Sequence, residues 1–207
     1  NAEKIIEAEK IVISAGSEPL SLPKFDFDEK KILSSTGALS LKSVPKKMLV
    51  IGGGYIGLEM GSVWSRLGSE VHVVEFLDHI TPGMDREISK EFLKILKKQG
   101  IKFHLESKVE SLKKESEGIT TKVLNKEGKK IDIKSEVVLV AIGRKPNTEK
   151  LNLKKIGIEL DNKKRIKIDK KYQTNVKKTN KGVTLQVSNK ENKKIDIESD
   201  ILLIAVG

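Results

Sequence analysis

The stretch that decides the fold reads Met48-Leu49-Val50-Ile51-Gly52-Gly53-Gly54-Tyr55-Ile56-Gly57-Leu58-Glu59. Its four leading apolar residues suit a buried parallel strand, and a helical pattern begins directly after the glycines. In the spacing Gly52-x-Gly54-x-x-Gly57, the first glycine permits a tight turn, the second lets a phosphate approach the backbone, and the third lets the helix pack close to the strand. The free N–H groups and the positive end of that helix would face the phosphates. The stretch therefore predicts a dinucleotide-binding turn.

The residues that follow support this prediction. A helix is expected from Tyr55 to Gly68, because apolar residues recur there at helical spacing. A second strand, Val71 to Val74, ends in Glu75, eighteen residues beyond Gly57 and close to the roughly 20 at which such motifs place a ribose-binding acid. At about 4 Å this carboxylate would repel a 2′-phosphate by on the order of 4 kcal/mol. We therefore predict NAD(H) over NADP(H), with a solvated acid at a strand end as the alternative for Glu75.

The pattern of strands and helices continues beyond Glu75 and predicts an α/β fold. An amphipathic helix is expected from Asp85 to Gln99, with Ile88, Phe92, Ile95 and Leu96 on one face, followed by a strand from Ile101 to Leu105. A short antiparallel meander follows, and an apolar run suited to burial on both faces, Val137 to Gly143, closes the unit. The order favours a Rossmann-like domain, in which a parallel sheet carries helices and a β-meander.

Composition limits the other interpretations of this chain of 207 residues, which has room for one large domain or two small ones. The longest apolar runs fall well short of the roughly 20 residues that span a bilayer, so no membrane association is predicted. The chain has no cysteine, which excludes a thiol nucleophile and fits a reducing compartment; we expect a cytoplasmic location. Its net charge is +11, but only four of forty basic residues are arginine and 4% of residues are aromatic, so nucleic-acid binding is not predicted.

The three histidines give no metal or acid/base prediction. His72 and His104 fall in predicted strands and His79 in a loop, and no carboxylate or second histidine stands at ligand spacing in the sequence. No metal ligand and no catalytic residue is predicted in this chain.

A family resemblance rests on several of these motifs together. The run Val50 to Glu59, Trp64-Ser65-Arg66-Leu67-Gly68, Val71 to Glu75 and Ala141-Ile142-Gly143-Arg144-Lys145-Pro146-Asn147 resembles the NAD domain of the dihydrolipoamide dehydrogenases, within the pyridine-nucleotide disulfide oxidoreductase family. The resemblance covers about residues 1 to 175. It implies electron transfer from dihydrolipoamide through a cysteine pair and FAD to NAD, and, for the family, lipoyl domains of 2-oxo acid dehydrogenase complexes as partners and a homodimer.

The same resemblance implies a division of the chain and a set of cofactor contacts. Residues 1–46 would be a partial FAD-domain segment and connector, 47–146 the NAD-binding domain, 147–175 a partial return to the FAD domain, and 176–207 a repeat of the 118–143 strand pair. Glu59 would lie where nicotinamide meets flavin, and Gly143 would close the nicotinamide side. The predicted cofactor-binding residues are Gly52, Gly54, Tyr55, Ile56, Gly57, Glu59, Glu75 and Gly143.

Several features of the family are not found in this sequence. The first glycine-rich FAD turn, the redox cysteine pair, the Gly-Asp motif expected after Val176 and the His-Glu acid/base pair are all missing, so we expect a fragment that does not turn over lipoamide alone. The alternatives are a sister reductase of the mercuric or glutathione type, or a non-catalytic remnant or interaction module. An NADPH enzyme of that group would be expected to carry basic residues near position 75.

An internal repeat occupies the place of the missing Gly-Asp motif. Residues 182–207 restate residues 118–143 at an offset of 64, with 15 of 26 positions identical. Two copies do not make a solenoid. We interpret the second copy as a piece of a related sequence that was joined on, and expect it either to compete for the first copy's place in the sheet or to stand as an exposed pair of strands.

Overall fold

The computed structural model describes residues 4–23, 25–176, 183–188 and 194–204. The chain divides into two compact units, one made of residues 19–143 and the other of residues 1–18 with residues 144–207. Each unit has its own sheets and its own core, and each is described by itself.

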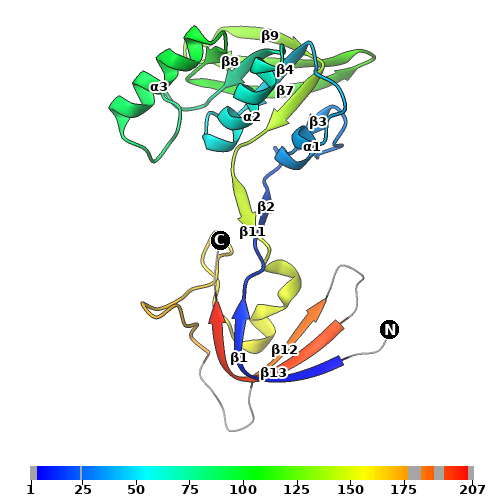
Figure 1. Ribbon diagram of the computed structural model, residues 1–207, viewed down its shortest axis with the longest axis vertical. Helices are drawn as coiled ribbons and strands as arrows, with labels where there is room; N and C mark the ends of the chain where they lie inside the picture. The colour runs from blue at the N-terminus through cyan, green and yellow to red at the C-terminus, as the bar shows by residue number, and fades with distance from the viewer. Residues whose placement is uncertain (1–3, 24, 177–182, 189–193, 205–207) are drawn as a thin grey trace. The chain divides into compact units, whose positions relative to one another are not determined.

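The unit of residues 19–143 is built on a parallel sheet of five strands in the order β3-β10-β4-β5-β6. The central strands are buried on both faces, which explains their nearly continuous apolar sequence. Their order places the glycine turn, which follows β4, in the middle of the sheet (Figure 1). The strands are β3 (Ile32–Leu33), β4 (Lys47–Ile51), β5 (Glu70–Val74), β6 (Lys102–His104) and β10 (Val137–Val140).

Helices cover one face of this sheet. They are α1 (Ser35–Leu39), α2 (Tyr55–Arg66) and α3 (Arg86–Lys98). Leu58 and Trp64 of α2 and Leu96 of α3 pack with side chains of β4 and β5 in one core cluster. The Asp85 side chain caps α3 by accepting from the N–H groups of its first turn, and Gly100, at φ +95°, follows its end.

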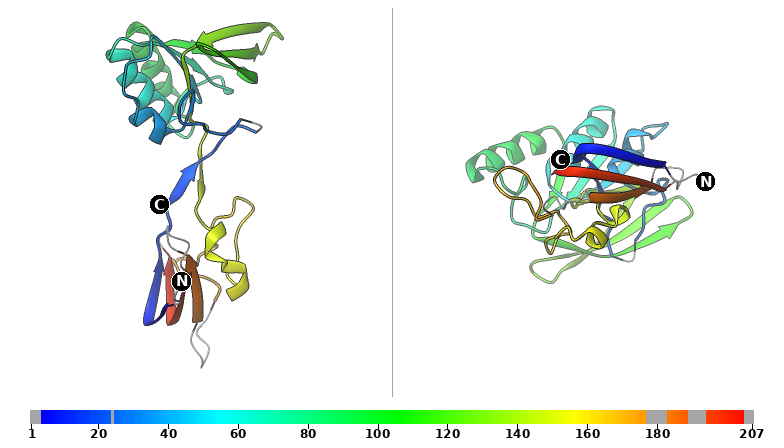
Figure 2. Two further views of the ribbon diagram at one scale, coloured as in Figure 1. Left: turned by 90° about the vertical axis from the view of Figure 1, so that its right-hand side faces the viewer. Right: turned by 90° about the horizontal axis from the view of Figure 1, so that it is seen from below.

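An antiparallel meander covers the opposite face, as the left view in Figure 2 shows. Its strands are β7 (Ser107–Glu115), β8 (Gly118–Asn125) and β9 (Lys130–Ser135). Leu112, Ile119 and Val123 of the meander form a second core cluster with Leu49 and Val138 of the sheet. The Rossmann-like α/β fold with a β-meander is therefore confirmed.

The helix is confirmed as α3, but its predicted apolar face is not the face that packs on the sheet. Of the four apolar residues, only Leu96 is buried, whereas Ile88 and Ile95 are more than half exposed and Phe92 is 37% exposed. The face that packs on the core instead carries Ser89, which is 1% exposed. The partly buried Leu93 follows it by one helical turn and the buried Leu96 by two. Helical periodicity correctly grouped the apolar residues on one side of the helix. It did not reveal which side faces the sheet, because the buried side includes the polar Ser89.

The second unit contains a sheet in the order β1-β13-β12, formed by β1 (Lys4–Ile13), β12 (Val183–Ser188) and β13 (Lys194–Ile204). A second, two-stranded sheet pairs β2 (Ser17–Pro19) with β11 (Arg144–Pro146). Two short 3-10 helices, η1 (Glu149–Leu151) and η2 (Leu153–Ile156), follow β11. Ile11 and Ile13 of β1 pack with Leu153, Ile158 and Ile166, so residues after 147 share a core with the N-terminal strand.

The repeat does not take the first copy's place in the parallel sheet, so the first of the two arrangements expected for it is wrong. β10 keeps its position between β3 and β4, while β13 pairs parallel with β1 from Lys4↔Ile195 to Ile13↔Ile204. β12 pairs antiparallel with β13, as β8 does with β9 in the first copy. Residues 177–182, 189–193 and 205–207, which belong to the predicted segment 176–207, lie outside the described residues.

The compact units differ from the predicted division at residues 46/47 and 146/147. Residues 19–46 belong to the same unit as the glycine turn, because β3 pairs with β10 and Ala38 of α1 lies in the helix-side core. Among the described residues, no helix is long and apolar enough to cross a membrane.

Candidate dinucleotide-binding site

The backbone conformation at Gly52 requires glycine. Its φ is +108°, and a Cβ there would fall well inside van der Waals contact with the carbonyl oxygen of Ala141. The Gly52 N–H donates to the carbonyl oxygen of Val74 at 2.9 Å, which ties the end of β4 to the end of β5. The chain therefore turns away from the sheet at this residue and enters α2.

Gly54 and Gly57 differ in what surrounds them. Gly54 has an ordinary extended backbone and caps α2 without a side-chain hydrogen bond, and a Cβ on it would meet no atom within 4 Å. A Cβ on Gly57 would instead press into the Gly52 carbonyl oxygen and come within 3.0 Å of a Val50 methyl group. Gly57 thus serves the packing of helix on strand, whereas Gly54 leaves open space beside the first turn of the helix.

The Glu75 carboxylate lies against the turn. It is 8% exposed, and its Oε2 accepts from the Gly53 N–H at 2.6 Å while its Oε1 accepts from the Leu77 N–H at 2.8 Å. A Cβ on Gly53 would come within 3.1–3.3 Å of Glu75 atoms. The acid at the end of β5 and the glycine turn after β4 therefore form one unit.

The start of α2, next to this acid, is a candidate anion site. The N–H groups of a helix's first turn have no partner within the helix, and they carry the positive end of its dipole. Tyr55 is 67% exposed and Ile56 half-buried, so the first turn is open to solvent. Phosphate oxygens could accept from these N–H groups beside the bare Gly54 Cα.

The remaining predicted residues lie apart from this cluster. Glu59 is an exposed residue one turn further along α2. Gly143 follows β10, is exposed, and adopts φ +131°, with its carbonyl oxygen accepting from the Leu20 N–H at 3.0 Å. The structure places Gly143 at the same carboxyl edge of the sheet as Gly52, since β10 and β4 are parallel neighbours.

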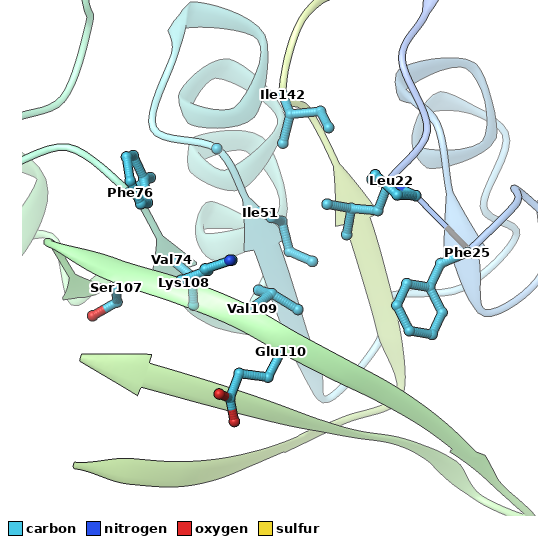
Figure 3. Close-up of a pocket in the computed structure, with 12 residues that line it drawn as sticks. Leu22, Phe25, Ile51, Val74, Phe76, Ser107, Lys108, Val109, Glu110 and Ile142 are labelled. Atoms are coloured by element: carbon cyan, nitrogen blue, oxygen red, sulfur yellow. The ribbon is translucent and has the colours of Figure 1, made fainter. Parts of the chain in front are cut away.

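A largely apolar pocket of about 490 Å³ opens beside the turn. Its lining includes Gly52, the strand ends Ile51 and Val74, and Ile142 after β10. The pocket therefore lies at the carboxyl edge of the parallel sheet, where α/β folds bind their ligands. Figure 3 shows Phe76 and Phe25 on opposite sides of this pocket, with Val109 of β7 beside Ile51.

Sequence reasoning missed several of these residues. Phe76 and Val109 line the pocket, but neither lies in a glycine or acid motif that would have marked it. Gly53 could have been singled out, since three consecutive glycines exceed what the motif requires. Its role depends on the approach of Glu75, 22 residues away.

The structure corrects the statement that the histidines lack polar partners at ligand spacing. His72 Nδ1 lies 3.0 Å from His104 Nε2, and His72 Nε2 lies 2.9 Å from Glu70 Oε1. The two ring planes are within 13° with centroids 5.3 Å apart, an end-to-end hydrogen-bonded pair. The residues are 32 apart in sequence but meet because β5 and β6 pair in parallel, with His72 opposite Lys102.

In this cluster Glu70 begins β5, His72 lies at the middle of that strand, and His104 is the last residue of β6. The His104 carbonyl oxygen accepts from the Glu75 N–H at 2.9 Å. Hydrogen bonds from Lys102 and His72 lower the pKa of Glu70 to about 2, so this carboxylate accepts and His72 Nε2 donates. Burial is the main cause that lowers the pKa of both His72 and His104 below the ordinary 6.5. Among the described residues, no group of three or more metal-ligating side chains is assembled.

Comparison with known proteins identifies the family. A family model described as pyridine nucleotide-disulphide oxidoreductase matches residues 1–180. The chain belongs to this family. A dihydrolipoamide dehydrogenase of Chaetomium thermophilum is 56% identical over 176 residues, and a mitochondrial dihydrolipoyl dehydrogenase of Dictyostelium discoideum is 51% identical over 176 residues. These matches cover 84% of this chain and 35% and 36% of the relatives, so the chain spans about a third of their length.

Solved structures agree with the family assignment. The HOCl-induced flavoprotein disulfide reductase RclA of Escherichia coli matches with a TM-score of 0.69 and 28% identity, over 80% of this chain and 37% of that protein. LpdA of Mycobacterium tuberculosis has a TM-score of 0.71 at 24% identity, over 80% of this chain and 35% of that one, and supports the fold.

Proposed function

We propose that residues 19–143 bind NAD(H), as the dinucleotide-binding region of a dihydrolipoamide dehydrogenase. The observation that carries this proposal is the contact between Glu75 and Gly53 beside the open first turn of α2. This contact supports the proposal because it brings an acid suited to a ribose and a helix end suited to a phosphate to the same turn.

The surroundings of the turn fit the cofactor. Pyrophosphate would lie over Gly54, where even an added Cβ would meet no atom within 4 Å, and accept from the N–H groups at the start of α2. The adenosine ribose would donate to the Glu75 carboxylate, whose two oxygens each have further lone pairs besides the N–H bonds that they accept. Val74 and Phe76 flank that acid and line the apolar pocket, so the adenine ring would lie on this side.

The charge of Glu75 supports NAD over NADP. A 2′-phosphate would lie next to a carboxylate that is only 8% exposed and that Gly53 and Leu77 hold in place. At about 4 Å the repulsion is on the order of 4 kcal/mol at an intermediate dielectric, a difference that corresponds to roughly 10³ in affinity.

The wider activity is part of the proposal, by membership of the family. In the whole enzyme, bound NAD would supply a two-electron acceptor, and the substrate would be dihydrolipoamide, presented on lipoyl domains of 2-oxo acid dehydrogenase complexes. The described residues supply the dinucleotide site; they include no cysteine pair and no complete flavin site, so no step through FAD is assigned to them. We predict that the chain alone does not oxidise dihydrolipoamide. A homodimer and a cytoplasmic location stay predictions, and the Dictyostelium relative is named as mitochondrial.

The single tryptophan gives a direct test of this proposal. Trp64 lies in α2 and is 8% exposed, so its emission reports on reduced nicotinamide bound near the turn. We expect saturable energy transfer with NADH and at least about tenfold weaker binding of NADPH. This difference is smaller than the roughly 10³ in affinity that the repulsion of the 2′-phosphate could supply. The charge control is Glu91→Gln, on the exposed side of α3, which should leave both titrations unchanged. Equal affinities for NADH and NADPH, or no saturation with either in a folded sample, would contradict the proposal.

A further inference from the structure

Thr81 adopts a backbone conformation that its side chain disfavours. Its φ is +50°, in the left-handed region, and it is 5% exposed. A β-branched residue with this conformation is a genuine outlier, and such strain persists only where the surroundings hold the residue in place. Thr81 therefore marks a position in the loop between β5 and α3 that other contacts determine.

Three hydrogen bonds hold this residue. Its carbonyl oxygen accepts from the Met84 N–H at 3.1 Å within the loop, and the other two bonds reach outside the loop. Its backbone N–H donates to the Gly53 carbonyl oxygen at 2.8 Å, and its hydroxyl lies 2.8 Å from the hydroxyl of Ser89. Ser89 is 1% exposed on the buried face of α3, and its N–H donates to the carbonyl oxygen of the capping residue Asp85. The Ser89 hydroxyl thus links the loop to a regular helix. This also explains the polar residue on the buried face of α3.

The bond to Gly53 bears on the candidate site because a peptide unit is planar and trans. In such a unit the C=O of Gly53 and the N–H of Gly54 point in opposite directions. When Thr81 fixes the Gly53 carbonyl oxygen on one side, it fixes the Gly54 N–H on the other. The preceding peptide unit is held in the same way, since Glu75 accepts from the Gly53 N–H.

We propose that Thr81, anchored by Ser89, is a positioning residue for the dinucleotide pyrophosphate: it orients the Gly54 N–H toward the open side of the turn. Thr81 does not touch the ligand; it acts through the Gly53–Gly54 peptide. This inference rests on the proposed function. It predicts that loss of the Thr81–Ser89 contact weakens binding of the phosphates and leaves the adenosine contacts at Glu75 unchanged.

The test compares ADP, which carries the pyrophosphate, with adenosine, which lacks it. Thr81→Val removes the hydroxyl at nearly constant shape, and Thr81→Ser keeps it. We expect Thr81→Val to weaken ADP binding about fivefold, the worth of one hydrogen bond, and adenosine binding less than about twofold. Thr81→Ser should bind both ligands like the parent chain. Binding is measured by calorimetry for ADP and by the shift of the Trp64 indole NMR signal for adenosine.

A second variant keeps the proposal testable if Thr81→Val does not fold. Ser89→Ala removes the anchoring hydroxyl within a helix, adds no volume, and should also weaken ADP more than adenosine. If ADP binding is unchanged in a folded Thr81→Val or Ser89→Ala variant, or if ADP and adenosine weaken equally, the positioning role is refuted. Failure of the parent chain to bind NADH would instead refute the proposed function, so the two failures are distinguishable.

Discussion

Replacing Glu75 by glutamine tests the role of this acid in both folding and selectivity. The glutamine side chain keeps one oxygen, so it can accept from either the Gly53 N–H or the Leu77 N–H but not from both. Its amide group then faces a backbone donor at a site that is 8% exposed. The substitution thus removes one charge-assisted hydrogen bond and leaves either the buried Gly53 N–H or the part-buried Leu77 N–H without an acceptor.

The expected loss of stability follows from that geometry. A charge-assisted hydrogen bond contributes about 1.5–3 kcal/mol to stability, and the cost of leaving a donor unsatisfied is of similar size. We therefore expect Glu75→Gln to lower the free energy of unfolding by about 2–3 kcal/mol. For a unit of this size the melting temperature should fall by roughly 6–15 °C. Loss of the negative charge should also reduce the preference for NADH over NADPH, because the repulsion of the 2′-phosphate disappears.

Two measurements on one variant check this reasoning. Thermal unfolding followed by circular dichroism gives the stability, and titration of Trp64 emission gives the two affinities. Glu91→Gln removes an exposed ion pair with Lys94 and should leave the melting temperature nearly unchanged, because solvent and salt screen such a pair. A Glu75→Gln variant with the parent's melting temperature would show that the carboxylate does not hold Gly53, and unchanged selectivity would show that it does not face the ribose.

Three further predictions follow from burial and titration. Gly57→Ala should destabilise the unit by about 1–3 kcal/mol by overpacking, measured by urea unfolding. Leu96→Ala should cost about 2–4 kcal/mol, whereas Ile95→Ala on the exposed side should cost under about 0.5 kcal/mol. Burial lowers the pKa of His72 and His104, so the unfolded chain binds more protons than the folded chain as the pH falls through 6.5. The free energy of unfolding should therefore keep its full contribution from these neutral histidines above pH 6.5 and decrease below it. His104→Phe should make that decrease smaller.

The sequence was most informative where a residue's role is local. Gly52 and Gly57 could be assigned because a positive φ and a close helix contact both demand glycine, and the structure shows both demands. The buried strand Val137–Val140 could be assigned because burial on both faces leaves only apolar residues.

Features that depend on long-range pairing could not be predicted in this way. The contact between His72 and His104 depends on the register of two strands, which the sequence spacing does not reveal. The burial of Ser89 depends on a hydroxyl partner in the loop before α3. The pairing of the repeat with β1 joins strands that lie about 190 residues apart in the sequence, and the repeat itself does not indicate this partner.

The central claim, that the glycine turn receives pyrophosphate, is tested most directly at Gly54. Its backbone suits alanine, and the added methyl would meet no protein atom within 4 Å, so Gly54→Ala should cost only about 1 kcal/mol of stability, as a poorer helix cap. The methyl would nevertheless occupy the space that a phosphate needs. We therefore predict a folded variant whose NADH affinity, measured through Trp64, falls by about tenfold or more, as expected for loss of at least about 1.4 kcal/mol. A folded Gly54→Ala variant that binds NADH as tightly as the parent chain would contradict the account.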